Sequence, residues 1–316
     1  MTDSLFPRSL DDLSDDSLPA GVVSPQASGA EQLTILESIG IKLIPELEFR
    51  EISEIIANHF GIRVTKNKLT LVTSRIHPIM VAHGFTSYRQ YLDTLACDKS
   101  GVMLSELANH ISTNHTAFFR EDAHFKLLLS SILPALSERK NKEGDHDLRI
   151  WCAACSTGEE AYSLQMCLMR HFGDEYRKWK AGVLATDISA SALEKAAAGV
   201  YSEQKAETVP FDMRMLYFSE KGKEMVEVVP EVRKEVTFRR LNLVNKNYPL
   251  KKPFDIIFCR NVMIYFDQVT RDDLIRRLHD WLTPGGYFFI GHSETVMGLD
   301  SLFDYVSPSV YTRRKG

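Results

Sequence analysis

Apolar side chains recur at helical spacing through the first part of the chain, from Pro45 to about Lys140. The stripes are Phe49–Ile56, Leu69–Ile79, Tyr88–Leu95, Leu104–Ile111 and Phe125–Leu136. Short polar connections separate them, so the pattern predicts a small all-helical domain over residues 41–140. The charged stretch Glu138–Asp147 is expected to be a flexible linker to the next domain.

The second part of the chain alternates short apolar runs with helical patterns, which is typical of an α/β fold. The expected strands are Arg149–Cys155, Gly182–Thr186, Val236–Leu243, Phe254–Cys259 and Tyr287–Ile290, followed by a hairpin over Phe303–Val306 and Ser309–Arg313. Helices are expected at Ser191–Ala198 and Leu274–Leu282, the second ended by Thr283-Pro284-Gly285-Gly286. This predicts an open α/β sheet in residues 141–316.

The stretch Tyr201–Arg240 is too long for one crossover between neighbouring strands. Met225–Pro230 and Val236–Phe238 alternate in polarity like strands, joined in part through Lys221-Gly222-Lys223. We therefore predict a small antiparallel β-subdomain inserted at about residues 200–240.

The stretch Arg149–Gln165 combines a buried strand, a turn of small residues and the start of an amphipathic helix. Ser156 or Thr157 is expected to cap this helix. The small side chains let a ligand lie close to the backbone, as in nucleotide-cofactor folds. Glu159 and Glu160 would repel a phosphate, so a cationic cofactor such as S-adenosylmethionine fits better. The alternative is an ordinary core strand followed by a solvated acidic helix start.

Polar side chains follow other predicted elements. Asp187 ends the second strand, where α/β folds hold a ribose diol, although it could also cap the next helix. Asn114, Thr116 and Arg120 lie beside two phenylalanines in a segment whose Ser, Thr and Asn residues favour a turn. A plain connecting loop would not need so many hydrogen-bond donors, so we expect this turn to contribute to a ligand site.

Composition narrows the class of protein. The 316 residues are 44% hydrophobic and 25% charged, with a formal net charge of −4 at pH 7. These values suit a soluble globular protein of two domains and argue against wholesale nucleic-acid binding. No long apolar run or signal-peptide pattern occurs, so we expect a cytoplasmic protein without membrane insertion. Residues 1–40 are expected to be a disordered acidic extension.

The five cysteines lie mostly in apolar runs, as expected for a reducing compartment. Cys152 and Cys155 have the spacing of a redox or metal pair, but no second ligand pair lies nearby. Both fall in a predicted strand, and we interpret them as small core residues. No metal site is predicted.

The helical part carries an uneven charge. Between Ile55 and Leu92 the chain has no aspartate or glutamate, and the basic residues there are Arg63, Lys66, Lys68, Arg75 and Arg89. Solvated helices usually mix both signs. A face carrying Lys68 and Arg75 is therefore predicted to attract an acidic surface, with a phosphate backbone or a merely solvated face as alternatives.

Five stretches together resemble the chemotaxis receptor glutamate methyltransferases of the CheR type. They are Thr116–Arg120, Ala154–Glu160, Ala185–Ile188, Phe258–Phe266 and Gly291–Glu294, and the resemblance covers about residues 45 to 314. It implies a class I S-adenosylmethionine-dependent methyltransferase sheet (Rossmann-like), an inserted antiparallel β-subdomain and an N-terminal all-helical domain. Ala161 stands where many members have proline, a change of little expected effect.

The resemblance also implies an activity: methyl transfer from S-adenosylmethionine to glutamate carboxylates of methyl-accepting chemotaxis receptors. The products would be S-adenosylhomocysteine and glutamate methyl esters that serve sensory adaptation. A carboxylate is already nucleophilic at neutral pH and the sulfonium is an activated donor, so no general base is required. Catalysis then depends on alignment of the reacting atoms and exclusion of water.

The same resemblance assigns the cofactor-binding residues: Asn114, Thr116, Arg120, Glu160, Asp187, Asn242, Leu243, Arg260 and Asn261. Glu160 would meet the amino or ribose region, Asp187 the ribose hydroxyls, and Asn242-Leu243 the adenine. Arg260, Asn261 and Tyr265 would line the transfer site. Arg120 and Tyr265 are the catalytic candidates, because they could orient the substrate carboxylate.

For partners, we expect the acidic helical region of a receptor to dock on the basic helical domain of a monomeric enzyme. Some members of the family also bind a receptor C-terminal peptide through a glycine-rich loop of the β-subdomain. Here Ser219–Met225 is short and has one glycine, so no peptide tether is predicted. A nucleic-acid methyltransferase and a non-catalytic cofactor sensor are the alternatives. The acidic net charge argues against the first, and the presence of Arg120, Asp187 and Tyr265 against the second.

Overall fold

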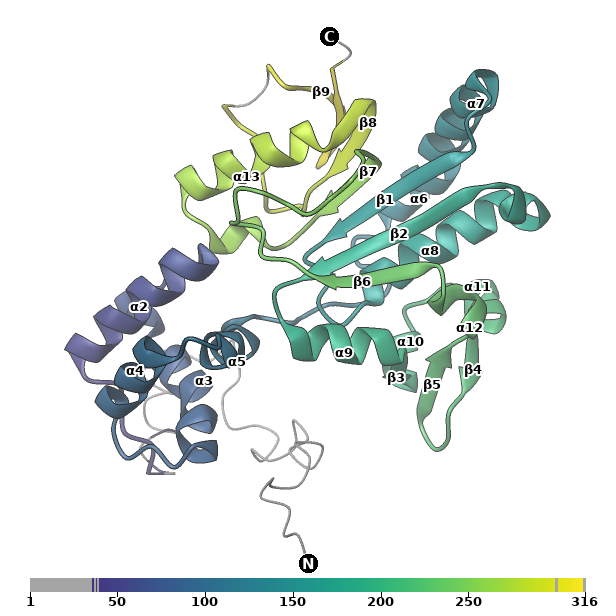
Figure 1. The fold of residues 1–316 in the computed structure, drawn as a ribbon. Helices are drawn as coiled ribbons and strands as arrows, with labels where there is room; N and C mark the ends of the chain where they lie inside the picture. The colour runs from purple at the N-terminus through teal and green to yellow at the C-terminus, as the bar shows by residue number, and fades with distance from the viewer. Residues whose placement is uncertain (1–35, 37, 39, 299–300, 315–316) are drawn as a thin grey trace, which may run out of the picture.

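The computed structural model describes residues 36, 38, 40–298 and 301–314, and most of the predicted acidic extension over 1–40 lies outside them (Figure 1). The first helices are α2 (Glu46–Phe60), η3 (Lys66–Lys68), α3 (Leu69–Ala82), α4 (Tyr88–Cys97) and α5 (Val102–Ile111). Their apolar stripes form one core, which includes the fully buried Ile52, Ile76 and Leu107. The predicted helical domain is confirmed.

The second core surrounds a seven-stranded sheet of order β6-β2-β1-β7-β8-β10-β9. The strands are β1 (Asp147–Ala153), β2 (Lys180–Asp187), β6 (Val236–Arg240), β7 (Phe254–Cys259), β8 (Leu282–Phe289), β9 (Phe303–Ser307) and β10 (Val310–Arg313). The first five are parallel to one another, whereas β10 is antiparallel to β8 and β9. Because every parallel strand ends on the same edge, their carboxyl ends can build one ligand site.

Helices cover both faces of this sheet, as alternation along β1 shows. Ile150 and Cys152 face a core shared with α8 (Glu159–Phe172), whereas Trp151 and Ala153 face one shared with α13 (Gln268–Asp280). In Figure 1 these two helices lie over different parts of the sheet. The remaining helices around the sheet are α6 (Ala123–Leu127), η4 (Leu128–Ile132), α7 (Leu133–Glu143), η5 (Gly173–Lys178), α9 (Ala190–Ala198) and η6 (Met263–Tyr265).

The last predicted stripe of the helical domain belongs to the sheet instead. Phe125, Leu128 and Leu136 pack in the same core as Leu148 and Ile150 of β1. The expected boundary at residue 140 therefore does not match the packing, because a stripe read from spacing does not reveal which core it joins. The expected flexible linker is also wrong, since α7 continues to Glu143.

Two further details differ from the sequence-based expectation. Strand β8 begins at Leu282 and runs through Thr283-Pro284-Gly285-Gly286, a stretch predicted to end a helix. The strand accommodates these residues with a register shift against β7 and a left-handed Gly285 (φ 69°). At α8 the cap is Gly158 (φ 95°), without a side-chain cap from Ser156 or Thr157.

The inserted subdomain is confirmed as a three-stranded antiparallel sheet of order β3-β5-β4. Its strands are β3 (Val200–Ser202), β4 (Phe218–Glu220) and β5 (Met225–Val228), with the short helices α10 (Glu203–Ala206), α11 (Phe211–Tyr217) and α12 (Pro230–Arg233). It lies at one end of the molecule, beyond α9 and β6 (Figure 1). Within the residues described, no helix is long and apolar enough to cross a membrane.

Candidate functional site

A pocket lies between the helical domain and the carboxyl ends of β1, β2, β6 and β7, with an empty volume of about 890 Å³ that includes its open mouth. Every residue predicted for the site lines it: Asn114, Thr116, Arg120, Glu160, Asp187, Asn242, Leu243, Arg260, Asn261 and Tyr265. The helical side adds Phe60, Ile62 and Ser112.

Backbone contacts hold the two sides of the pocket together. Ile62 forms an antiparallel bridge with Phe266, and the Arg63 N–H donates to the Tyr265 carbonyl at 3.0 Å. Gly61 permits this approach, because a Cβ there would lie 2.5 Å from Val244 Cγ1. The helical domain is therefore one wall of the pocket.

The turn after β1 has a strained backbone that leaves room for a ligand. Ala154 (φ 66°) and Ser156 (φ 50°) are left-handed without being glycine. The Ser156 N–H donates to Asp187 Oδ2 at 2.8 Å, which fixes the turn against the end of β2. Small side chains and a fixed turn bring the backbone itself to the pocket wall.

Asp187 supplies a buried carboxylate, only 6% exposed. Its Oδ1 accepts the Ser189 N–H at 2.9 Å, and Ser189, not Asp187, caps α9. Burial raises the pKa of Asp187 above its ordinary value, against the opposing effect of the N–H groups of Ser189 and Ser156. Each oxygen has further lone-pair capacity, so the carboxylate can still accept ligand hydroxyls.

Arg260 is enclosed by other protein groups. Its side chain is fully buried and pairs with Glu160 at 2.7 Å and Glu121 at 2.8 Å, while Nη2 donates to the Arg120 carbonyl at 2.7 Å. Burial lowers its pKa, but the carboxylate of Glu160 and then that of Glu121 outweigh this and leave the pKa raised. Arg260 lines the pocket as predicted, but these contacts favour a positioning role over a direct contact with the cofactor.

Arg120 has a different environment. It is half-buried, and its Nη1 donates to the His115 carbonyl at 3.1 Å. Among the residues that the structure covers, no carboxylate pairs with it. Its neighbours Phe119 (φ 52°) and Glu121 (φ 57°) are left-handed, so the backbone bends sharply around this side chain. Arg120 is thus a pocket arginine whose charge remains available.

The Glu294 carboxylate fixes the loop that carries Asn261 and Tyr265. Glu294 accepts N–H groups from Gly291 at 2.6 Å, Asn261 at 2.9 Å and Met263 at 2.7 Å. Burial raises the pKa of Glu294, opposed by these backbone N–H groups. Asn261 is left-handed (φ 58°), and its hydrogen bond to Glu294 holds that conformation. Tyr265 follows in η6 and is half-buried at the pocket.

Comparison with known proteins accounts for this arrangement. The family model described as "CheR methyltransferase, SAM binding domain" matches residues 114–312, and "CheR methyltransferase, all-alpha domain" matches residues 47–112. The chain belongs to the CheR methyltransferase family. It is accordingly an S-adenosylmethionine-dependent methyltransferase.

Relatives of the CheR family align over most of the chain. A chemotaxis protein methyltransferase of Borreliella burgdorferi is 38% identical over 266 residues, which cover 84% of this chain and 94% of the relative. One of Escherichia coli is 35% identical over 302 residues, covering 95% and 99%. Chemotaxis protein methyltransferase 1 of Pseudomonas aeruginosa is 36% identical over 260 residues, covering 81% and 93%.

The pocket of this CheR-family chain fits S-adenosylmethionine. Asp187 provides a carboxylate without an ion-pair partner among the described residues, and Phe60, Leu241 and Leu243 provide apolar walls. The Asn242 amide is already used inside the protein: Nδ2 donates to the His59 carbonyl at 2.6 Å, and Oδ1 accepts the Val244 N–H at 3.1 Å. Asn242 therefore also ties the two domains together beside the pocket.

Arg75 corrects the predicted docking face of the helical domain. Its guanidinium donates to the carbonyls of Ile111 and Ser112 and, at 3.0 Å, to Thr113 Oγ1. Burial lowers the pKa of Arg75. Its guanidinium is therefore used in contacts within the protein and is not free to bind a partner. It caps α5 and holds the loop that leads to Asn114. Lys66 and Arg89 also pair with neighbouring carboxylates.

Sequence reasoning missed several residues that organise this CheR-family site. Glu121 directly follows Arg120, and Glu294 closes the stretch Gly291–Glu294, yet neither carries a predicted role. Both residues lie within or next to stretches that carry the family resemblance, and this position could have indicated a role for them. Cys152, by contrast, is a core residue as expected: burial raises its pKa well above the ordinary value, and its thiol donates to Glu160 Oε1 at 3.2 Å.

Proposed function

We propose that this enzyme methylates glutamate side chains of methyl-accepting chemotaxis receptors in the cytoplasm, giving glutamate methyl esters. Arg120 carries this proposal: it lines the pocket as an arginine without a carboxylate partner among the residues described, whereas Arg260 has two. A free guanidinium can bind a substrate carboxylate through paired hydrogen bonds. The relatives named above are chemotaxis protein methyltransferases, which supports the same substrate class.

The pocket is lined by acidic, basic and apolar side chains, and this mixture supports places for both cofactor and acceptor. Asp187 offers a carboxylate to the cofactor, and the apolar side chains of Leu241 and Leu243 also line the pocket. When bound, S-adenosylmethionine supplies a methyl group activated by its sulfonium. The protein binds it, excludes water and holds the acceptor oxygen in line.

Arg120 and Tyr265 would orient the acceptor carboxylate. Both line the pocket, Arg120 from the segment between α5 and α6 and Tyr265 from η6 after β7. The Tyr265 hydroxyl can donate one hydrogen bond while Arg120 supplies the positive charge. Complete neutralisation would reduce the nucleophilicity of the carboxylate, so partial exposure of Arg120 suits a positioning role.

A receptor would meet the enzyme near the pocket mouth. Arg63 is exposed, and its backbone N–H donates to the Tyr265 carbonyl. Lys68 follows at the end of η3 and is half-buried. Neither side chain has an ion pair among the residues of known placement. We therefore move the proposed contact with an acidic receptor helix from Lys68 and Arg75 to Lys68 and Arg63.

Kinetics of Tyr265→Phe and Arg120→Lys test the proposed roles. Both variants should reduce the rate of receptor methylation by roughly tenfold or more, which corresponds to about 1.4 kcal/mol or more. Tyr305→Phe, on the exposed hairpin, is the matched control and should keep the wild-type rate. If Tyr265→Phe and Arg120→Lys both keep that rate, these side chains do not orient the acceptor.

A further inference from the structure

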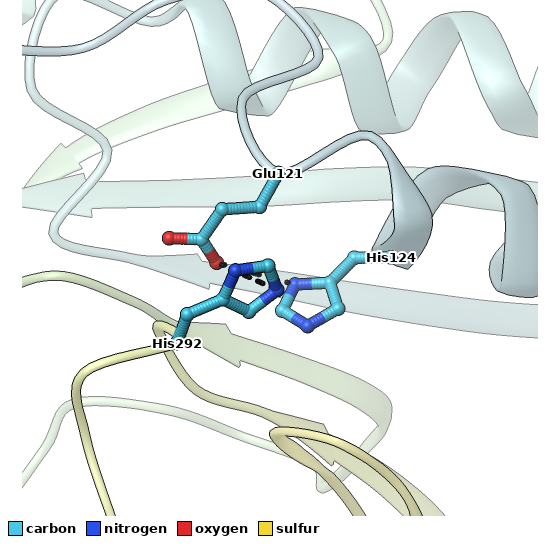
Figure 2. Close-up of side chains that lie close together, drawn as sticks. All are labelled: Glu121, His124 and His292. Atoms are coloured by element: carbon cyan, nitrogen blue, oxygen red, sulfur yellow. Dashed lines mark ion pairs between the residues drawn. The ribbon is translucent and has the colours of Figure 1, made fainter.

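Glu121 and His124, three residues apart in the segment after Arg120, meet His292 from a distant part of the chain (Figure 2). Glu121, His124 and His292 place one ligand-type atom each within 4.8 Å of the others. Glu121 Oε2 lies 3.7 Å from His124 Nδ1 and 3.7 Å from His292 Nε2. Two imidazoles and one carboxylate are a donor set that borderline divalent metal ions favour.

His124 supplies an independent observation. Only 2% of the residue is exposed, yet neither ring nitrogen makes a hydrogen bond of normal geometry with a described residue. A buried imidazole that lacks well-formed hydrogen bonds is costly, so such a group calls for an explanation. The ring faces the cluster, with His292 at a centroid distance of 4.9 Å, and the Pro308 carbonyl lies nearby. A carbonyl beside a ligating histidine is the usual outer partner in metal sites.

The distances are compatible with one shared ion. Two atoms bound to the same zinc lie at most about 4.2 Å apart, because each bond is about 2.1 Å long. Both separations from Glu121 are already below that limit, and the ligand nitrogens of the two histidines lie within 4.8 Å of each other, so a small movement of one ring would complete the site. His292 is 52% exposed in its side chain, so its ring can adjust and an ion can enter from solvent.

Arg260 is the competing cation, because it lies 2.8 Å from Glu121 Oε2. It also pairs with Glu160, so these three groups carry a formal charge of −1 (one arginine, two carboxylates). A divalent ion therefore enters a cluster of net negative charge. It would share or take the Glu121 oxygen that now faces Arg260.

We propose that Glu121, His124 and His292 form an inhibitory site for a borderline divalent metal ion such as zinc. Two imidazole nitrogens and one carboxylate oxygen would bind the ion, and solvent would complete its shell. Metal binding would move the Glu121 carboxylate away from Arg260. Because Arg260 also donates to the Arg120 carbonyl, this movement would disturb the backbone bend that places Arg120 at the pocket. Occupancy of the site therefore slows methyl transfer.

Titration of tag-free, full-length protein with Co²⁺ tests the site directly, because four-coordinate Co²⁺ has a visible spectrum that Zn²⁺ abolishes by competition. His292→Ala removes one ligand and should weaken metal binding at least about tenfold. The matched control is His83→Ala, which removes another partly exposed histidine beside a carboxylate, Glu106 at 2.8 Å. It should bind Co²⁺ like the wild type.

The same proteins then receive Zn²⁺ in a methyl-transfer assay, each rate being divided by that protein's rate without metal. Wild type and His83→Ala should be slowed alike, and His292→Ala should be slowed less. A Co²⁺ spectrum that survives both His292→Ala and His124→Gln overturns the proposal. Equal slowing of all variants by Zn²⁺ overturns the inhibitory role.

Discussion

Five residues that line the pocket or flank a lining residue have left-handed backbones although none is glycine: Phe119, Glu121, Ala154, Ser156 and Asn261. Each such residue costs of order 1 kcal/mol, so neighbouring contacts must hold it in place. Carboxylates do this at two of them, where Asp187 accepts from Ser156 and Glu294 accepts from Asn261. Strain and well-fixed acceptors are therefore concentrated at the ligand site.

Replacement of Asp187 by alanine should weaken S-adenosylmethionine binding by about 1–3 kcal/mol, because ligand hydroxyls lose a charged acceptor and the Ser156 turn loses its anchor. Isothermal titration calorimetry measures the change in affinity. Thermal unfolding of the same sample separates a loss of fold from a loss of binding. An unchanged affinity would show that the end of β2 does not hold the cofactor.

At the same scale, the family resemblance predicted which residues line the pocket but not the environment of each one. All ten predicted residues line it: Asn114, Thr116 and Arg120 lie between α5 and α6, and the other seven lie at or after the carboxyl ends of parallel strands that share one edge. That Arg260 is enclosed and Arg120 is free depends on Glu121 and Glu160. No local pattern in the sequence shows which arginine a distant carboxylate will pair with.

At the scale of elements, Glu294 fixes the loop after β7 by accepting three backbone N–H groups. Glu294→Gln replaces one acceptor oxygen by a donor amide and should lower the free energy of unfolding by about 1–3 kcal/mol. Urea unfolding measures it. Glu220→Gln on the exposed strand β4 is the control and should stay within about 0.5 kcal/mol of wild type. Equal stability of the two variants would show that the hydrogen bonds of Glu294 do not stabilise the fold.

Lys140 fastens α7 to the sheet through Asp145 at 2.9 Å and Asp255 at 3.0 Å. Burial lowers the pKa of Lys140, but the two carboxylates outweigh it, so the folded pKa lies above the ordinary value. The folded state therefore holds the proton more tightly. Its stabilising contribution is complete below the unfolded pKa of about 10.4 and is lost as pH rises through the folded pKa.

Lys140→Met should lower the free energy of unfolding at pH 7 by about 3–5 kcal/mol, since Asp255 would remain buried without its cation. The difference from wild type should shrink above about pH 10.4. Urea unfolding at neutral pH and at a pH above that value measures both effects. Lys142→Met, whose exposed side chain pairs with Glu138, is the control and should change little. A pH-independent difference would rule out the linkage.

The type and order of most elements followed from apolar periodicity, since both domains bury one face of each helix. The errors have a common cause in tertiary context. The Phe125–Leu136 stripe carries no mark of the core that it joins, and Pro284-Gly285-Gly286 lies in a strand because β7 and β10 flank it. Local turn chemistry could not predict that pairing.

At the scale of the molecule, charge reversal at Arg63 and Lys68 tests how receptors dock. Arg63→Glu with Lys68→Glu should slow receptor methylation severalfold and leave cofactor affinity unchanged. The wild-type rate should fall with added salt, as for any screened encounter. Lys42→Glu with Lys99→Glu changes the same charge at exposed positions of the same domain outside the acid-free stretch between Ile55 and Leu92. Equal rates for the two double variants would place docking elsewhere.

The β-subdomain gives a second prediction at this scale. The turn between β4 and β5 is short, with one glycine, so we propose that no receptor C-terminal peptide adds to this sheet. Fluorescence titration of such a peptide should show no saturable binding at micromolar concentrations. Saturable binding would contradict the proposal, and the exposed Phe211, Met215 and Leu216 of α11 would then be the first positions to replace.

The most direct test of the account is transfer of a tritiated methyl group from S-adenosylmethionine to receptor-containing membranes. The account predicts incorporation into the receptor band that is released by mild base, as expected for a glutamate methyl ester, and that falls sharply with Asp187→Ala. Base-stable incorporation, incorporation into nucleic acid, or no incorporation by the folded wild-type enzyme would contradict it.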